Sequence, residues 1–175
     1  MDSYIKAYSY SLGFHSNTYV NKIGMSNVDQ IGWKGAYYID KNGTKQPVLV
    51  KLLIPKSSIR TKYVNSLEEK YAKHRCDCAK VLGFYSYYNG NELKNVKVAI
   101  SFSDNDFYYR KNRYVRPVRK FSKEVLVCAS GVHYFYSKTS AFVYMDYFSL
   151  SLTYNFKTRK RIIRKILTFF GKNRI

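Results

Sequence analysis

The sequence predicts an α+β protein: a curved antiparallel sheet built from hairpins, with two short helices and a basic helix at the C-terminus. Apolar runs separated by Asn-Gly turns recur in the first hundred residues, which is typical of hairpins. The 19 Tyr and 11 Phe suit strands with one wet face, because a tyrosine ring can be buried while its hydroxyl reaches the surface. A hydrophobic content of 46% over 175 residues is enough for a real core.

Two hairpins account for most of the predicted sheet. Residues 33–40 and 47–54 are joined by the turn Lys41-Asn42-Gly43, and Pro55 ends the second run. Residues 78–88 and 93–102 are joined by Asn89-Gly90-Asn91 and form the clearer hairpin. A third strand at 107–109 follows the turn cluster 103–106. Residues 1–25 suggest a strand or an aromatic arm, interrupted by glycines.

The helices have recognisable starts. Ser66 and Glu69 have the spacing of a capping box, which predicts a helix over 66–74. Near residue 130 we expect a strand at 125–128, a tight turn freed by Gly131, a strand at 132–136 and a helix at 138–147 capped by Ser137. Residues 1–155 are therefore one domain, and 156–175 are a separate basic amphipathic helix.

The net charge indicates the class of partner. Lys and Arg number 31 against 11 Asp and Glu, a formal charge of +20. Such a charge attracts polyanions, so nucleic acid, an acidic protein surface and anionic lipid are the partners to weigh. No apolar run approaches the roughly 18 residues that span a bilayer, so we expect no transmembrane segment.

Basic residues gather in two places where they could bind a polyanion. In the first, cations alternate with aromatic and β-branched residues, so that the cations could bind phosphates while the rings stack on bases. The alternative is that this stretch is a solvated loop. Pro117 favours an edge strand or a connection over a central strand. The second is the C-terminal helix, which could instead pack on its own domain or dock on an acidic protein. The predicted contact residues are Arg110, Lys111, Arg113, Tyr114, Arg116, Arg119 and Lys120, then Lys157, Arg159, Lys160, Arg161, Arg164 and Lys165.

Metal and nucleophile chemistry have weaker candidates. Zinc takes four nitrogen or sulfur ligands, and the candidates are His74, Cys76, Cys78, Cys128 and His133. Because Cys-x-Cys is not the spacing of ordinary structural zinc sites, we favour buried, inert cysteines and expect no cofactor. A Cys128–His133 pair could act as a nucleophile and base, but no orienting third group is visible. The odd cysteine count and the absence of a signal segment predict a reducing, intracellular compartment.

The order of several sequence blocks resembles a domain of unknown function common in giant DNA viruses of amoebae, where it often accompanies pentapeptide repeats. The resemblance covers about residues 33–147, and its most specific part is the Cys-x-x-Gly-Val-His-Tyr-Phe block at 128–135. The blocks are Trp33-Lys34-Gly35, Val48 to Pro55, Lys73 to Arg75 with Ala79 to Leu82, Ser101 with Asp104, Phe107 and Tyr109, and Cys128 to Phe135 with Ala141 and Tyr144.

This resemblance implies a viral protein of the host cytoplasm (the viral factory) or of the virion, and supplies no activity. The chain departs from the pattern at His74, where a cysteine is expected, and it lacks pentapeptide repeats, which suggests a stand-alone adaptor or packaging role. Three functions follow as hypotheses. The first is a non-enzymatic protein that binds a polyanion, above all nucleic acid. The second is a structural or interaction protein that docks its basic helix on an acidic viral or host protein. The third is a small transferase-like enzyme centred on His133, which would need a deep pocket there.

Overall fold

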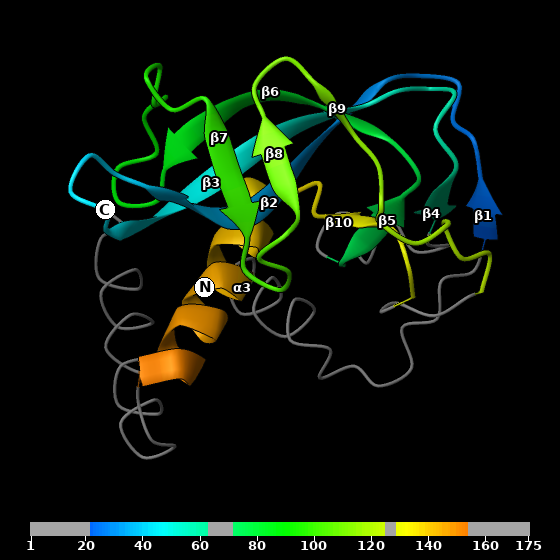
Figure 1. The fold of residues 1–175 in the computed structure, drawn as a ribbon. Helices are drawn as coiled ribbons and strands as arrows, with labels where there is room; N and C mark the ends of the chain where they lie inside the picture. The colour runs from blue at the N-terminus through cyan, green and yellow to red at the C-terminus, as the bar shows by residue number, and fades with distance from the viewer. Residues whose placement is uncertain (1–21, 63–71, 125–128, 154–175) are drawn as a thin grey trace, which may run out of the picture.

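The computed structural model describes residues 22–62, 72–124 and 129–153, which form two antiparallel sheets and a helix (Figure 1). A six-stranded sheet has the order β8-β7-β2-β3-β6-β9, and a four-stranded sheet has the order β1-β4-β5-β10. The elements are β1 (Lys22–Gly24), β2 (Gln30–Ile39), β3 (Lys45–Ile54), β4 (Arg60–Lys62), β5 (His74–Cys76), β6 (Ala79–Ser86), β7 (Val98–Ser101), β8 (Tyr108–Arg110), β9 (Tyr114–Val115), β10 (Val132–Tyr134) and α3 (Lys138–Thr153).

The first predicted hairpin is confirmed as the pair β2–β3, which stays in register from Gln30↔Ile54 to Ile39↔Lys45. Its turn is held by Asp40, whose carboxylate accepts hydrogen bonds from the backbone N–H groups of Asn42 and Thr44, each at 2.9 Å. Gly43 has a φ of 77°, a left-handed conformation that glycine adopts without a Cβ penalty. The two long strands form the centre of the larger sheet.

The second predicted hairpin is wrong in its pairing. The chain does turn at residues 86–91, where Ser86 N donates to Asn91 O at 2.7 Å. However, β6 pairs with β3 and β7 pairs with β2, so the two strands lie on opposite sides of the central hairpin. Alternation of apolar residues fixes which face of a strand is buried, but it does not fix which strand lies next to it. The predicted third strand is confirmed as β8, which pairs with β7.

The larger sheet curls until its two outer strands lie beside each other. β8 and β9 are joined by a turn in which Asn112 has a φ of 64°. This turn is anchored to β6, because Asn112 N donates to Val81 O and Val81 N donates to Arg113 O, both at 2.9 Å. The concave side encloses the main core, which includes Val50, Leu52, Val81, Phe84, Tyr109, Val115 and Tyr134.

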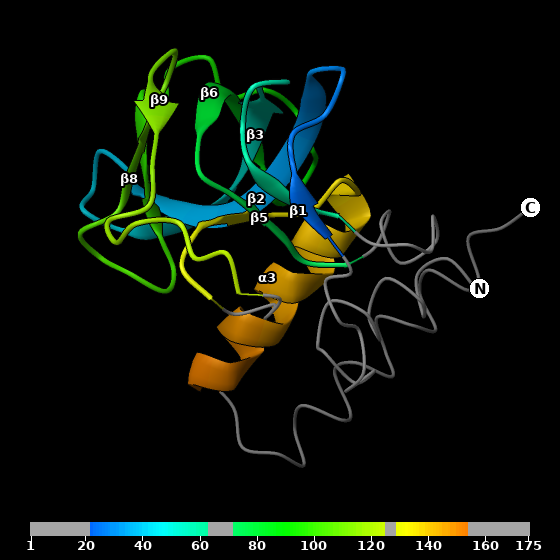
Figure 2. The same cartoon turned by 90° about the vertical axis from the view of Figure 1, so that its right-hand side faces the viewer.

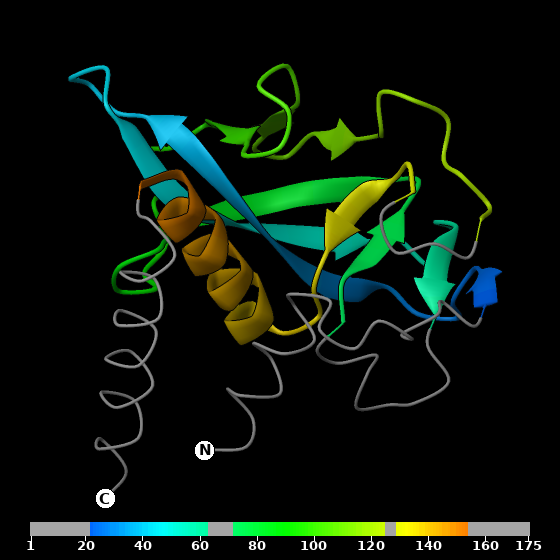
Figure 3. The same ribbon diagram turned by 90° about the horizontal axis from the view of Figure 1, so that it is seen from below.

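The helix α3 covers the convex side of the larger sheet (Figure 2). Its predicted cap is confirmed, because Ser137 Oγ accepts from Ser140 N at 3.3 Å, and the helix continues beyond the predicted residue 147 to Thr153. Figure 3 shows α3 crossing β2. At the crossing a Cβ on Gly35 would lie 2.0 Å from Met145 Cγ, so only glycine allows this approach.

The smaller sheet corrects the predicted helix over 66–74. His74 lies in β5 and not at a helix end, and β5 pairs with β10 through His74↔Tyr134 and Cys76↔Val132. Lys-His-Arg at 73–75 suited a helix C-terminus, but these side chains serve a strand instead: His74 and Arg75 are both buried. Residues 63–71, where the predicted capping box lies, and the predicted strand at 125–128 are outside the described residues.

The fold is therefore mostly β, and the predicted α+β class holds only in its coarse form. Part of the smaller sheet was not predicted, since β4 is three residues long and carries no apolar alternation. Of the strand or aromatic arm predicted for residues 1–25, residues 22–24 form β1, and residues 1–21 lie outside the described residues, as does the predicted basic helix at 156–175. Over the described ranges, the structure contains no helix long and apolar enough to cross a membrane.

Candidate functional site

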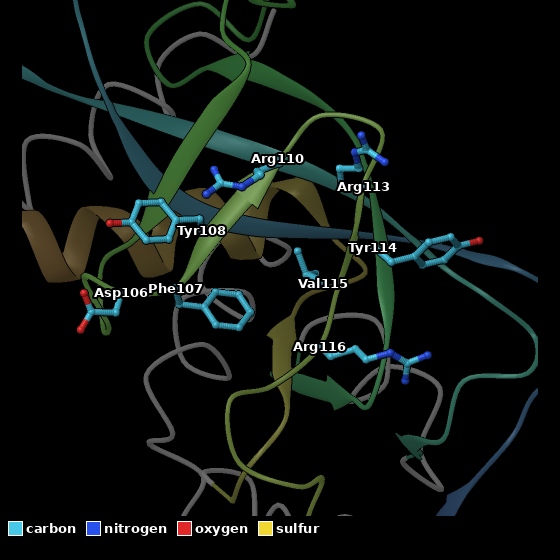
Figure 4. Close-up of a pocket in the computed structure, with 8 residues that line it drawn as sticks. All are labelled: Asp106, Phe107, Tyr108, Arg110, Arg113, Tyr114, Val115 and Arg116. Atoms are coloured by element: carbon cyan, nitrogen blue, oxygen red, sulfur yellow. The ribbon is translucent and has the colours of Figure 1, made fainter.

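A hollow of about 330 Å³ lies between β8 and β9, the two outer strands that the curl of the sheet brings together (Figure 4). Three arginines and two tyrosines contribute to its lining. The residues around it are Asp106, Phe107, Tyr108, Arg110, Arg113, Tyr114, Val115 and Arg116. The residues that line this hollow come from two segments, 106–110 and 113–116, on either side of the turn between β8 and β9.

Strand alternation explains why the basic side chains face solvent. Tyr109 and Val115 point into the core with 2% and 7% of their surface exposed. Their neighbours must then point outward, since successive residues of a strand face opposite sides. Tyr114 is accordingly 60% exposed and Tyr108 is 42% exposed. Such rings on an outer surface are available for stacking.

The charges of the hollow are largely uncompensated. The Arg110 guanidinium lies 5.2 Å from the centre of the Tyr108 ring, and Lys80 Nζ lies 6.0 Å from that of Tyr114. Within the described part of the chain, no carboxylate forms an ion pair with Arg110, Arg113 or Arg116. Asp106 is the one acidic residue in the lining, against three arginines. The site therefore has a net positive potential toward solvent.

The structure brings four of the predicted contact residues together and separates three others. Arg110, Arg113, Tyr114 and Arg116 line the same hollow, whereas Lys111 forms an ion pair of 3.0 Å with Glu92 on the side of β6. Arg119 and Lys120 are exposed on the connection that follows β9. The predicted tail residues Lys157, Arg159, Lys160, Arg161, Arg164 and Lys165 lie outside the described residues.

Two aromatic residues of the hollow were not predicted as part of the site. The sequence pattern places Phe107 and Tyr108 in a third strand and indicates no binding role for them. Their position just before the basic run was the available signal, because a strand pair joined by a short turn places residues on both sides of that turn face to face.

The candidate zinc ligands do not converge in the described part of the structure. His74 and Cys76 share one face of β5, but His133 pairs with Arg75, so it points to the opposite face. Cys78 follows the strand and is buried, and Cys128 lies outside the described residues. Among the residues described, no three His, Cys, Asp or Glu side chains are grouped to hold a metal ion.

Cys76, Cys78 and His74 are buried residues whose contacts stabilise the fold. Burial raises the pKa of Cys76 to about 12, and its Sγ lies 3.7 Å from Val132 O. The pKa of Cys78 is raised for the same reason. The His74 ring stacks on Tyr134 with centroids 5.5 Å apart, and its Nδ1 lies 3.3 Å from Thr61 O. Protonated thiols are poor nucleophiles and poor metal ligands.

His133 is half-buried and borders a second hollow, of about 540 Å³. The transferase-like hypothesis required a deep pocket at this position, whereas the hollow that His133 borders is wide and open, so an enzymatic role stays a prediction. Its proposed partner Cys128 is outside the described residues, so the structure does not address that pair. Gly131, which also lines this hollow, corrects a prediction: it has no positive φ, and it is needed because a Cβ would lie 2.9 Å from the Cβ of Arg75.

These observations define a mostly β protein that carries an exposed basic and aromatic hollow. Residues 17–141 match a family of unknown function, DUF5758, and the chain belongs to this family. No curated protein and no solved structure matches the chain. The family assignment carries no activity, so function has to be argued from the site.

Proposed function

We propose that this protein binds nucleic acid, with no enzymatic step, through the hollow between β8 and β9. The observation that carries the proposal is that Arg110, Arg113 and Arg116 line one hollow together with exposed Tyr108 and Tyr114. Figure 4 shows the two tyrosines on opposite sides of this hollow, each pointing outward. Guanidinium groups bind phosphate oxygens in bidentate fashion, and tyrosine rings stack on bases of any sequence. Together the two kinds of contact can hold a single strand without reading its sequence.

The shape of the site favours single-stranded over double-stranded nucleic acid. A duplex hides its base faces in the stack, so exposed rings have no free base to stack on. The hollow presents two exposed rings on strand edges instead. In a single strand the bases are free to stack on Tyr114 and Tyr108 while the backbone follows the arginines.

The rest of the chain supports the same partner through charge. The formal charge of +20 attracts any polyanion over long range and accelerates association. We propose that the basic segment 156–175 adds further phosphate contacts. The alternative, in which this segment docks on an acidic viral or host protein, stays open as a second role of the tail.

We further propose a viral setting for the protein, as a component of the virion or of the viral factory in the host cytoplasm. The support is the resemblance of the blocks between residues 33 and 147, and above all of Cys-x-x-Gly-Val-His-Tyr-Phe, to the domain found in giant viruses of amoebae. A nucleic-acid-binding role fits a packaging or adaptor protein.

The test is binding of a fluorescently labelled oligonucleotide, single-stranded or duplex, measured by anisotropy at low and moderate salt. We expect the R113Q/R116Q variant to bind the single strand at least about tenfold more weakly than the wild type. The matched control is K41Q/K56Q, which removes the same charge from exposed lysines of the β2–β3 turn and the segment after β3. Undetectable binding of both nucleic acids at low salt would refute the proposal, and equal losses in the two variants would remove the hollow from it.

Deletion of residues 156–175 distinguishes nucleic-acid binding by this segment from docking on an acidic protein. If the tail mainly docks on a protein, the truncated chain keeps its affinity for the oligonucleotide and loses a partner that co-purifies with the full chain. If the tail serves nucleic acid, affinity falls and the salt dependence becomes shallower, because fewer counterions are released.

A further inference from the structure

The second hollow lies where two strands leave the same edge of β2. β10 meets this edge at Trp33, which exchanges two backbone hydrogen bonds with Phe135, and β7 meets it at Ala36 and Tyr37. Between these contacts lies Lys34. The space of about 540 Å³ there is in the size range of small-molecule sites.

Lys34 is an unusual residue to find in this position. Only 8% of its surface is exposed, and within the described chain no carboxylate lies within ion-pair distance of it. Its Nζ lies 5.8 Å from the centre of the Tyr144 ring. Burial, and then the nearby charge of Lys73, lower the pKa of Lys34 to about 8. A buried cation without an anion is costly, so an anionic ligand would relieve that cost.

The hollow holds further hydrogen-bond donors from three other segments. The hydroxyl groups of Ser101 and Ser103 lie 3.1 Å apart at the end of β7, so one can donate to the other and leave a proton free for a ligand. Arg119 and His133 come from the opposite wall. Asp104 is the acidic residue of the lining, against the positive charges of Lys34 and Arg119.

That opposite wall is fastened by a buried arginine. Arg75 Nη1 donates to Ser130 O at 3.1 Å and to Ser122 O at 2.5 Å, and its Nη2 donates to Glu124 O. Residues 129–131 therefore face the hollow in a fixed position. Donors held on rigid backbone bind a ligand without a large ordering cost.

The remaining lining is apolar or aromatic. Phe107, Pro117 and Val118 border the hollow, and Tyr109 closes it toward the core. A bare phosphate ion would fill only part of this volume. A few polar groups beside an apolar wall are typical of sites for small organic molecules.

We propose that this hollow binds a small organic phosphate, with the phosphate group beside Lys34 and the serines and the organic part against Phe107, Pro117 and Val118. A phosphate has several oxygens and nearly two negative charges, so it can use the ammonium, the guanidinium and the hydroxyl donors together. A carboxylate has two oxygens and would leave some of these donors unfilled. The site does not depend on the proposed function at β8 and β9.

The experiment uses the full chain and titrates inorganic phosphate, phenyl phosphate and benzoate by calorimetry. Phenyl phosphate should bind most tightly, because it uses both parts of the hollow. The K34M variant should bind it at least about tenfold more weakly, whereas K41M, which changes an exposed turn lysine, should bind like the wild type. Since K34M removes a buried charge, it should fold at least as well as the wild type, so lost binding would not reflect unfolding.

Three outcomes overturn the proposal. They are no saturable binding of phenyl phosphate to the wild type, equal affinity of K34M and wild type, and benzoate binding as tightly as phenyl phosphate. The R113Q/R116Q variant should keep its affinity for phenyl phosphate while losing the oligonucleotide. Failure of the oligonucleotide experiment alone would therefore leave the phosphate site standing, and the reverse also holds.

Discussion

Trp33 and Phe135 exchange backbone hydrogen bonds of 2.7 and 2.8 Å, and this pair of bonds connects the two sheets. It places β10 against one half of the edge of β2 while β7 occupies the other half. Neither partner strand is long enough to cover the whole edge. The hollow at Lys34 follows from this arrangement, so a two-residue contact determines where the second candidate site lies.

The stability of the protein should rise with pH as Lys34 loses its proton. Its pKa is lowered from 10.5 to about 8 by burial and by Lys73. Below pH 8 the lysine is charged in both states and the burial cost is fully present. Between about pH 8 and about pH 10.5 the unfolded chain binds more protons, so the free energy of unfolding increases.

The Lys34→Met variant isolates this effect. At neutral pH it should unfold with a free energy higher than that of the wild type by on the order of 2 kcal/mol, and the difference should shrink toward zero near pH 10.5. Urea unfolding across this range measures it, with Lys41→Met as the exposed control. A variant that is less stable than the wild type at neutral pH would show that the lysine is compensated after all.

Gly35 should not tolerate alanine. A Cβ there would lie 2.0 Å from Met145 Cγ, so α3 has to move away from β2 or Met145 has to change its rotamer. We expect the free energy of unfolding to fall by about 1–3 kcal/mol. Gly24→Ala is the matched control, because a Cβ at Gly24 meets nothing within 4 Å. In a Met145→Ala background the cost of Gly35→Ala should largely disappear, and additive costs would contradict the contact.

Cys76 and Cys78 should not react with iodoacetamide in the folded protein at neutral pH. Both are buried, and burial raises their pKa values, to about 12 for Cys76. The thiolate is the reactive form, so alkylation should require unfolding. A Cys128→Ser variant removes the third thiol, and mass spectrometry before and after denaturation counts the modified sites. Rapid modification of either cysteine under native conditions would contradict this picture.

Local turn chemistry made parts of the fold predictable. The turn at Lys41-Asn42-Gly43 and the Ser137 cap are signals carried by neighbouring residues, and both appear in the structure as expected. The pairing of β7 with β2, by contrast, is a contact between strands that are far apart in the sequence. It depends on which long strand has a free edge once the other strands have paired, so neighbouring residues do not predict it. Residues around 86–91 form a turn in either arrangement, so the turn alone did not decide the partner.

In the candidate sites too, features that depend on neighbouring residues were predictable and features that depend on long-range packing were not. The alternation of basic and aromatic residues singled out four of the residues that line the first hollow, because it is a local pattern. Lys34 gave no comparable signal, since a lysine between a tryptophan and a glycine does not reveal that its strand will be covered on both sides. His74 illustrates the opposite error: its basic neighbours favoured a helix end, but packing against Tyr134 places it in a strand.

The two kinds of contact in the proposed nucleic-acid site should differ in their dependence on salt. For a single strand, each phosphate contact removed should make the slope of log K against log salt shallower by about 0.7, so R113Q/R116Q should change it by about 1.4. Tyr114→Leu should instead weaken binding by about 1–3 kcal/mol and leave the slope unchanged, because stacking releases no counterions. Tyr114 is 60% exposed, so its loss should not affect folding. Anisotropy titrations at four salt concentrations provide both numbers, and a slope that changes with Tyr114→Leu but not with the arginine pair would reverse the assigned roles.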